Sequence, residues 1–298
     1  MGIKNIIKSF AHEKGIIVGV CDAEPLEISE SAEHTPFFHY KPEVRANPSK
    51  MLTDARSIIV IGVGYNRELA FELDDEPRGR FSLGAVGLDY HYTLMGILDE
   101  LETRLRLAGY VFECVKSVDT GPLPEKKLAL KANLGWISRK GLVVSEKFGS
   151  FFNIGYMVTT LLVEPWVDLN FEEGDCGDCG ICAAACPGRA IGGDSPYRYR
   201  ECISFLTQKK GALSADERRV MGSWLYGCDV CQKVCPYNAN TYAGKIESID
   251  AVMPRLDDIL NLDKKEFNAR YKSTAIYWRG LANLKRNAAV ALENWGKR

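Results

Sequence analysis

The chain has 298 residues, and its 38 basic residues nearly balance 39 acidic ones, for a formal net charge of −1. Hydrophobic residues make up 46 % of the chain and charged residues 26 %, which is the balance of a globular protein with a substantial core. This composition excludes a disordered, collagen-like or coiled-coil chain, and the near-zero charge excludes a global field that attracts nucleic acid or anionic membrane. Neither a signal peptide nor a membrane-spanning run is recognisable, so we expect a reducing, cytoplasmic setting with thiols available for metal binding.

Helical and strand-like patterns alternate over the first 170 residues, which is typical of an α/β or an α+β fold, and of these two classes we expect α+β. The clearest strand is rich in β-branched residues, and the longest helix has leucines at helical spacing. The expected helices are Ile3–Lys14, Asp89–Leu107 and Pro122–Ala132, and the expected strands are Gly15–Val20, Ser57–Val63, Tyr110–Val115 and Phe151–Val163. After the cysteine-rich region, the last expected helical element is Ala275–Trp295.

Eight of the ten cysteines lie between Cys176 and Cys235. The first group has the spacing C-x2-C-x2-C-x3-C-P of bacterial ferredoxins, in which the fourth cysteine binds the other cluster of a pair. The second group repeats the x2 and x3 spacings but lacks a leading cysteine, which Cys202 can supply. Structural zinc is the alternative, but zinc sites normally use pairs of C-x2-C. The pattern therefore predicts two [4Fe-4S] clusters.

Cross-ligation between the two groups assigns the ligands of each cluster. Cluster one is expected to take Cys176, Cys179, Cys182 and Cys235. Cluster two is expected to take Cys186, Cys202, Cys228 and Cys231. Two such clusters form a short path for single electrons, and the first 170 residues are the natural place for the centre that receives them. Cys21 and Cys114 lie in apolar, strand-like contexts and are expected to be structural.

The first 170 residues show few familiar cofactor motifs. Gly62 and Gly64 follow a strand, but the next residues break the G-x-G-x-x-G pattern, so a nicotinamide-binding turn is not expected. The histidines have no metal-ligand spacing, and each is more simply read as a surface or core residue. They are His12, His34, His39 and His91.

Several motifs, in the same order along nearly the whole chain, resemble the epoxyqueuosine reductases. The cysteine-region motifs are CGDCGICAAACPGRAI from Cys176, ECISFLTQKKG from Glu201 and LYGCDVCQKVCPYN from Leu225. Upstream are GLDYH ending at His91, VDTG starting at Val118, ANLGW ending at Trp136 and FGS ending at Ser150. Downstream are WRG ending at Gly280 and KRNAAV ending at Val290.

This resemblance implies an oxidoreductase that reduces epoxyqueuosine in tRNA to queuosine. Electrons would pass from a reduced ferredoxin or flavodoxin-type donor through the clusters to cobalamin (B12), which would lie between the first domain and the nearer cluster. The family's proton donor is the aspartate of its VD-T/S motif, here Asp119. Capping of the following helix is the alternative role for this residue. The resemblance also implies corrin contacts at Arg45, Asp119, Lys140, Val143 and Ile154.

The same resemblance divides the chain into three parts. Residues 1–170 would bind cobalamin and substrate, 171–242 would form the double [4Fe-4S] ferredoxin-like domain, and 243–298 would be a short helical tail. We expect a short form of the family without its C-terminal HEAT-like repeats. One residue after LGW, the family usually has Gly or Ala followed by Lys and Asn. At this place the present chain has Ser138, Arg139, Lys140 and Gly141.

The C-terminal tail is basic, and its charge is relevant to whether the substrate is a tRNA. Residues 263–298 hold nine Lys or Arg against three Asp or Glu, an excess of six positive charges. Either this is a solvated helix face or it binds tRNA phosphates in place of the missing repeats. Two other functions stay open: a corrinoid reductase of a small molecule, as in the related reductive dehalogenases, and a ferredoxin-type electron carrier without corrin.

Overall fold

The computed structural model describes residues 2–28, 36–37, 40–167, 174–192, 197–242 and 244–297. The chain forms two compact units. The first unit comprises Met1–Gly64, His91–Ser138 and Leu142–Asp175, and the second comprises Tyr65–Tyr90, Arg139–Gly141 and Cys176–Arg298. Helices accompany a mainly antiparallel set of strands, which confirms the α+β class. None of the described helices is both long enough and apolar enough to cross a membrane.

The first unit is built on a five-stranded sheet in the order β5-β8-β2-β1-β9, with every neighbouring pair antiparallel. Its strands are β1 (Ile17–Asp22), β2 (Ser57–Gly64), β5 (Cys114–Val118), β8 (Phe152–Thr159) and β9 (Trp166–Val167). The central strand β2 is buried over its first six residues because both of its faces are covered. The other elements of this unit are α1 (Ile3–Lys14), α2 (Pro42–Ala46), the 3-10 helix η1 (Pro48–Lys50), α3 (Tyr90–Leu107), α4 (Glu125–Lys131), β6 (Trp136–Ile137) and β7 (Val143–Val144).

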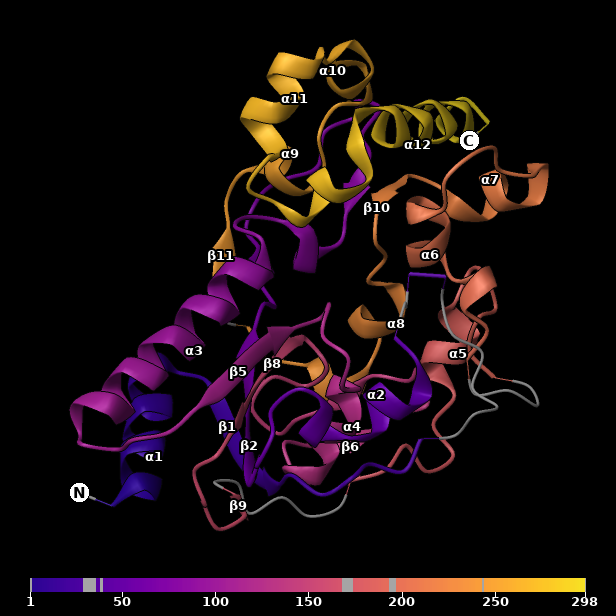
Figure 1. Ribbon diagram of the computed structural model, residues 1–298. Coiled ribbons are helices and arrows are strands. Elements are labelled where there is room, and N and C mark those ends of the chain that lie inside the picture. Colours follow the sequence, from indigo (N-terminus) through magenta and orange to yellow (C-terminus); the bar gives the residue numbers. More distant parts are fainter. Residues whose placement is uncertain are drawn as a thin grey trace. The chain divides into compact units, whose positions relative to one another are not determined.

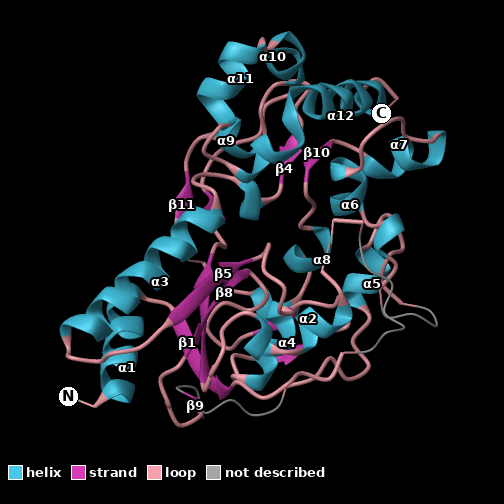
Figure 2. Cartoon of the chain, in the orientation of Figure 1, coloured by secondary structure: helices cyan, strands magenta, loops and turns pink. Residues whose placement is uncertain are grey.

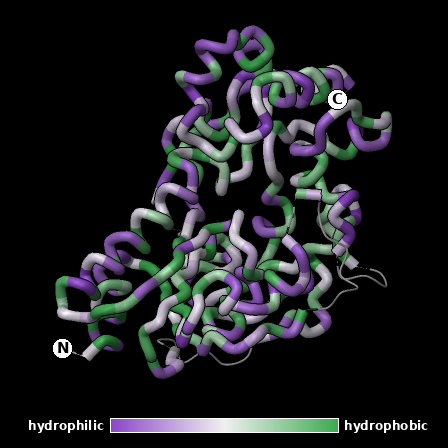
Figure 3. Tube along the Cα trace, in the orientation of Figure 1, coloured by the Kyte–Doolittle hydropathy of each residue, from purple (hydrophilic) through white to green (hydrophobic). Residues whose placement is uncertain are grey.

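Helices cover both faces of this sheet (Figures 1 and 2). A Cβ on Gly155 of β8 would lie 3.1 Å from the Leu94 side chain, so α3 packs directly on that face. On the opposite face, a Cβ on Gly19 of β1 would lie 2.1 Å from the carbonyl oxygen of Ala132, at the end of α4. The two glycines thus allow the helices to approach the strands closely. Apolar and polar segments alternate along α3 in Figure 3, as its leucine spacing predicts.

Most predicted elements of the first unit are present, with shifted ends. The helix Ile3–Lys14 has the predicted bounds, and the predicted long helix begins one residue later, at Tyr90. The prediction of a strand over Tyr110–Val115 was wrong in position, because pairing with β8 begins only at Cys114. The helix predicted from Pro122 starts at Glu125, since Pro124 occupies its N-cap.

The second unit consists of short helices and two-stranded ladders. Its strands are β3 (Glu68–Leu69), β4 (Arg80–Phe81), β10 (Trp224–Tyr226) and β11 (Lys245–Ile246), and β4 pairs with β10 as β3 pairs with β11. Its α-helices are α5 (Ile181–Ala185), α6 (Ile203–Gln208), α7 (Ala215–Met221), α8 (Val230–Lys233), α9 (Ile249–Val252), α10 (Leu256–Asn261), α11 (Lys264–Tyr271) and α12 (Gly280–Trp295). Its 3-10 helices are η2 (Leu83–Ala85), η3 (Tyr199–Glu201), η4 (Pro236–Asn238) and η5 (Ala275–Arg279).

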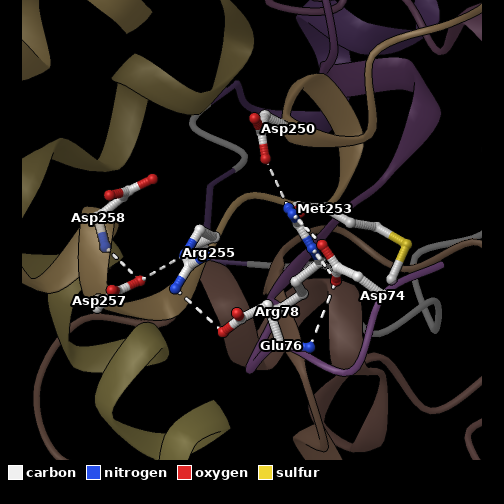
Figure 4. A network of polar contacts seen from close by, with 8 residues as sticks. All are labelled: Asp74, Glu76, Arg78, Asp250, Met253, Arg255, Asp257 and Asp258. Atoms are coloured by element: carbon white, nitrogen blue, oxygen red, sulfur yellow. Dashed lines mark hydrogen bonds and ion pairs between the residues drawn. The ribbon is translucent and has the colours of Figure 1, made fainter.

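The segment Tyr65–Tyr90 belongs to the second unit, although it lies in the first half of the sequence. One anchor is Arg78, which is 7 % exposed and donates hydrogen bonds to Asp74, Asp250 and the carbonyl oxygen of Met253 (Figure 4). A buried guanidinium needs such charged and carbonyl partners to offset its lost hydration. Arg78 therefore ties this segment to the region around α9.

A second anchor joins the same segment to the cysteine motif. Asp229, between two of the cysteines, is 1 % exposed and accepts hydrogen bonds from Ser82 Oγ at 2.6 Å and Leu83 N at 2.7 Å. The preceding Gly227 has φ 71°, and a Cβ there would lie 2.5 Å from Ser82 Cβ. The segment is thus positioned directly against the second cysteine group.

The last helix is fixed by buried polar residues of the KRNAAV motif. Asn287 is fully buried and its Nδ2 donates to the carbonyl oxygens of Thr207 at 2.8 Å and Leu225 at 2.7 Å. Arg286 donates to the carbonyl oxygens of Lys209 and Gly211 at 2.5 and 2.8 Å. These bonds satisfy backbone carbonyl groups at and after the end of α6 and in β10, so this motif holds α12 in place.

Candidate functional site

Four cysteines from two distant segments surround one small cavity in the second unit. They are Cys176, Cys179, Cys182 and Cys235, and Lys140, Ile181, Pro236 and Tyr237 complete the lining. Cys176 and Cys179 lie on the loop before α5, Cys182 lies in the first turn of α5, and Cys235 follows α8. Within the described ranges, no three His, Cys, Asp or Glu side chains meet closely enough to hold a single metal ion. Four thiols around one cavity form the ligand set that a cubane requires.

The other four cysteines of the region lie near one another. Burial raises the pKa of the Cys228 and Cys231 thiols, the latter to about 12, and the neighbouring Cys202 adds to both shifts. Cys186 and Cys182 also add to the shift of Cys231, so the two groups of thiols adjoin. The structure thus brings together the ligand sets that the sequence predicts for clusters one and two. Short separation between such sets suits transfer of single electrons.

Two hydrogen bonds to cysteine sulfurs come from the short segment Arg139–Gly141, which belongs to the second unit. The backbone N–H of Arg139 donates to Cys176 Sγ at 3.3 Å, and Lys140 Nζ donates to Cys235 Sγ at 3.1 Å. Lys140 is 4 % exposed. The predicted corrin contact at Lys140 stays a prediction, and the contact that the structure gives this side chain is with a cysteine.

Asp119 lies in the first unit, immediately after β5, with a left-handed φ of 55°. It does not cap the next helix: the N-cap of α4 is Pro124, five residues later. The side chain of Asp119 is 56 % exposed, and its Oδ2 lies 3.7 Å from Nε2 of His91, in the first turn of α3. The structure therefore joins the VDTG and GLDYH motifs and presents a carboxyl group beside an imidazole.

Glu125 holds the backbone of the Asp119 turn. The backbone N–H of Asp119 donates a hydrogen bond to Oε1 of Glu125. Burial raises the pKa of Glu125 to about 8, and the negative charge of Asp119 adds to this rise. Glu125 therefore keeps its proton at neutral pH while its carbonyl oxygen accepts the amide hydrogen bond.

The glycine of the VDTG motif is required by close packing. A Cβ on Gly121 would lie 2.0 Å from Ser117 Oγ and 2.3 Å from the hydroxyl oxygen of Tyr156. That same hydroxyl accepts a hydrogen bond from the backbone N–H of Leu123 at 3.3 Å. The turn between β5 and α4 is thus packed onto β8, which gives Asp119 a rigid base.

The other predicted corrin contacts differ in how much surface they offer. Arg45, in α2, is 8 % exposed, and its burial lowers the pKa of the guanidinium. Val143, in β7, is 4 % exposed and belongs to the same hydrophobic cluster that Ile154 of β8 packs against. Ile154 is only half-buried. Val143 and Ile154 therefore belong to the same core region, and of the two only Ile154 has side-chain surface left for a ligand.

The basic tail is less uniform than its composition indicates. Arg286 is committed to backbone carbonyls, and Arg279 stacks on the ring of Trp278 at 3.5 Å. The exposed cations in the described part of the tail are Lys264, Lys265, Arg270, Lys272 and Lys297; Arg298 lies outside the described residues. A nucleic-acid surface in this region would have to use these exposed cations.

Sequence reasoning identified Asp119 but missed two partners of its loop. His91 was expected to be an unremarkable surface or core residue, and Glu125 was not singled out. His91 stands in a motif that carries the family resemblance, which was the available signal. The carboxyl of Glu125 offered no comparable signal, because only the folded turn brings it to the amide of Asp119.

Comparison with known proteins matches two regions to family models. Residues 45–120 match the model described as epoxyqueuosine reductase QueG, and residues 175–238 match a 4Fe-4S double cluster binding domain. The second range contains all eight cysteines of the two groups. The double-cluster prediction is therefore confirmed at the level of the domain.

Known relatives match the chain over most of its length. The epoxyqueuosine reductase of Lactococcus garvieae is 34 % identical over 91 % of this chain and 78 % of its own length. The solved structure of the Streptococcus thermophilus epoxyqueuosine reductase is 35 % identical, with a TM-score of 0.91 over 99 % of this chain and 82 % of that one. An epoxyqueuosine reductase solved with an epoxyqueuosine-modified tRNA-Tyr stem loop is 28 % identical, with a TM-score of 0.87 and coverages of 99 % and 82 %.

A more distant likeness extends to the catabolic reductive dehalogenase NpRdhA. That chain is 17 % identical, with a TM-score of 0.50 over 97 % of this chain and 37 % of its own. At this identity the likeness concerns the fold alone. The long, collinear matches to the reductases show that this chain belongs to the epoxyqueuosine reductase family.

Proposed function

We propose that this oxidoreductase converts epoxyqueuosine in tRNA to queuosine, using two [4Fe-4S] clusters and cobalamin. The observation that carries the proposal is full-length similarity, over 99 % of this chain, to a reductase solved with an epoxyqueuosine-modified tRNA stem loop. The thiol-lined cavity and the Asp119 loop lie within the matched length. Removal of the epoxide oxygen as water needs two electrons and two protons, so the protein must supply both.

The two groups of cysteines would bring the electrons. Cluster one would be held by Cys176, Cys179, Cys182 and Cys235, and cluster two by Cys186, Cys202, Cys228 and Cys231. Helix α5, which contains Cys182, contacts helix α8, which contains Cys231, and this contact supports a relay between the two clusters. A reduced ferredoxin or flavodoxin-type protein is the proposed donor, because the clusters take up electrons singly.

The candidate corrin contacts fit cobalamin chemically. A corrin has apolar faces and an edge of amide side chains, so it needs both apolar surface and hydrogen-bond donors. The half-buried Ile154 provides apolar surface, and the buried guanidinium of Arg45 provides N–H donors that suit amide carbonyls. Val143 is buried and would contribute through its backbone. Bound cobalamin would supply the reduced cobalt centre that delivers electrons to the epoxide.

Asp119 would donate the proton that the departing oxygen requires. Its carboxyl is exposed, so it can approach a substrate, and it stands on a left-handed turn, a backbone conformation that is frequent at functional sites. His91, 3.7 Å away, would return a proton to Asp119 after each turnover. Glu125 would act as a positioning residue by holding the Asp119 amide.

The test is conversion of tRNA by the reconstituted protein. The protein is loaded with iron, sulfide and cobalamin, reduced with a low-potential one-electron donor, and incubated with tRNA that carries epoxyqueuosine. Digestion to nucleosides and mass spectrometry then measure queuosine. We expect queuosine to form only when iron, cobalamin and reductant are all present.

Two controls separate the other functions. Formation of product from the free nucleoside or a halogenated phenol, but not from tRNA, would assign the protein to small-molecule reduction. If the protein holds both clusters but does not bind cobalamin, the remaining function is that of an electron carrier. A tRNA substrate would be met in the cytoplasm, so we propose that the natural donor is a cytoplasmic protein.

A further inference from the structure

Lys140 is a buried cation against the proposed cluster one. Its Nζ donates a hydrogen bond to Cys235 Sγ at 3.1 Å, and the residue lines the cavity that Cys176, Cys179 and Cys182 share. The side chain is 4 % exposed, so the ammonium group is largely removed from water. The ammonium group therefore lies among the proposed ligands of cluster one.

No carboxylate balances this charge in the part of the chain that the structure describes. Among the described residues, the one polar partner of the Lys140 side chain is the sulfur of Cys235. Removing an ammonium group from water is costly unless a nearby negative charge compensates it. Four thiolates around an iron–sulfur core provide that negative charge, so the lysine and the cluster suit each other electrostatically.

We propose that Lys140 is a positioning residue that raises the reduction potential of cluster one. Reduction adds one negative charge to the cluster, and a fixed positive charge at its ligand sulfur stabilises the reduced state more than the oxidised state. The desolvated setting strengthens this effect, because little water screens the charge. The proposal rests on the ligand assignment of cluster one given above.

Arg139 offers a matched control in the adjacent position. Its backbone N–H donates to Cys176 Sγ, but its side chain is exposed and its guanidinium contacts the carbonyl oxygen of Gly177 at 3.0 Å. Arg139→Gln therefore removes the same formal charge from a solvated site and leaves the backbone hydrogen bond in place. Solvent and salt screen such a charge, so its loss should have little effect on the cluster.

The experiment is a redox titration of the reconstituted protein, followed by electron paramagnetic resonance. Iron content and the signal of the reduced clusters first show whether both clusters are present. We expect two one-electron waves, one of which moves to lower potential in Lys140→Met. A tenfold loss in the equilibrium constant for reduction corresponds to a fall of about 59 mV for one electron, and we expect a shift of about this size.

Further variants separate charge from hydrogen bonding and from simple structural damage. Lys140→Arg keeps the charge and should stay near the wild-type potential, whereas Lys140→Gln keeps only a neutral donor and should fall between Arg and Met. If Lys140→Met fails to hold iron, the reduction potentials of Lys140→Arg and Lys140→Gln are compared instead. Equal potentials in these two variants would overturn the proposal. Equal shifts in Lys140→Met and Arg139→Gln, or no shift in either, would also overturn it. Absence of clusters in the wild type would instead contradict the ligand assignment.

Discussion

Nε2 of His91 lies 3.7 Å from Oδ2 of Asp119, although 28 residues separate them in the sequence. His91 stands in the first turn of α3 and Asp119 follows β5, whose neighbour β8 packs against α3. The pair thus depends on the packing of a helix on a sheet. It places an imidazole within ion-pair distance of the carboxyl group.

Asp119→Asn should abolish most turnover and leave the clusters intact. The amide keeps the shape and the hydrogen-bonding ability of the carboxyl but cannot transfer its proton, so we expect a loss of roughly 10²–10⁴-fold. Single-turnover formation of queuosine measures the rate, and iron content and the visible spectrum serve as controls. Near-normal turnover would remove Asp119 from the proposed mechanism.

His91→Gln should slow the reaction less than the change at Asp119. Loss of a partner that orients a reacting group typically costs about 10–100-fold. If His91 acts through Asp119, the two changes will not be additive, and the double variant will resemble Asp119→Asn. Additive losses would show that the imidazole acts independently.

Cys202→Ala should remove one cluster and spare the other. We expect the iron content to fall from about eight to about four atoms per chain, because each cubane holds four. Cys114→Ala is the matched control: Cys114 lies in β5, and burial raises the pKa of its thiol to about 11. Full iron content in Cys202→Ala would show that another residue completes the second cluster.

Glu125 should make folding stability depend on pH. Burial raises its pKa from 4.5 to about 8, so the folded protein holds this proton more tightly than the unfolded chain. The contribution is fully present below about pH 4.5 and is lost as pH rises to about 8, at a rate of up to about 1.4 kcal/mol per pH unit. Glu125→Gln cannot titrate and should lose this component.

Urea unfolding of wild type and Glu125→Gln between pH 5 and 8.5 measures the difference. The stability of the variant relative to wild type should increase with pH across this window. A difference that stays constant with pH would mean that Glu125 titrates alike in the folded and unfolded states.

Charge reversal in the exposed part of the tail should weaken tRNA binding. Lys265→Glu with Lys272→Glu changes two exposed side chains on and next to α11. Each lost phosphate contact should reduce the slope of log affinity against log salt by about 0.7–0.9. The comparison is the tRNA affinity of wild type and of the double variant across a salt series. Unchanged affinity and slope would identify this surface as a solvated helix face.

Arg286→Glu is unsuitable for that test, although composition alone made Arg286 an attractive candidate. Its guanidinium bonds to the carbonyl oxygens of Lys209 and Gly211, so reversal would leave those groups facing a carboxylate. We therefore expect loss of stability rather than a selective loss of tRNA binding. Thermal unfolding distinguishes these two outcomes.

Much of this protein could be determined from the sequence by itself. The cysteine spacing indicated two clusters because each loop must present several thiols within a few residues, and that requirement is local. Ile3–Lys14 was recognisable because burial of one face imposes a helical period on the side chains, and Ser57–Val63 because a strand covered on both faces is a continuous run of β-branched residues. Collinear motifs then indicated the family.

Other features were decided only by the tertiary structure, because they join segments that no local pattern relates. Tyr65–Tyr90 packs in the second unit through Arg78 and Ser82, whose partners lie far along the chain. Lys140 was expected at the corrin, and the structure gives it a hydrogen bond to Cys235, 95 residues away. Burial and pairing over such separations depend on how elements pack, and this is why the partners of Asp119 and Lys140 emerged only with the fold.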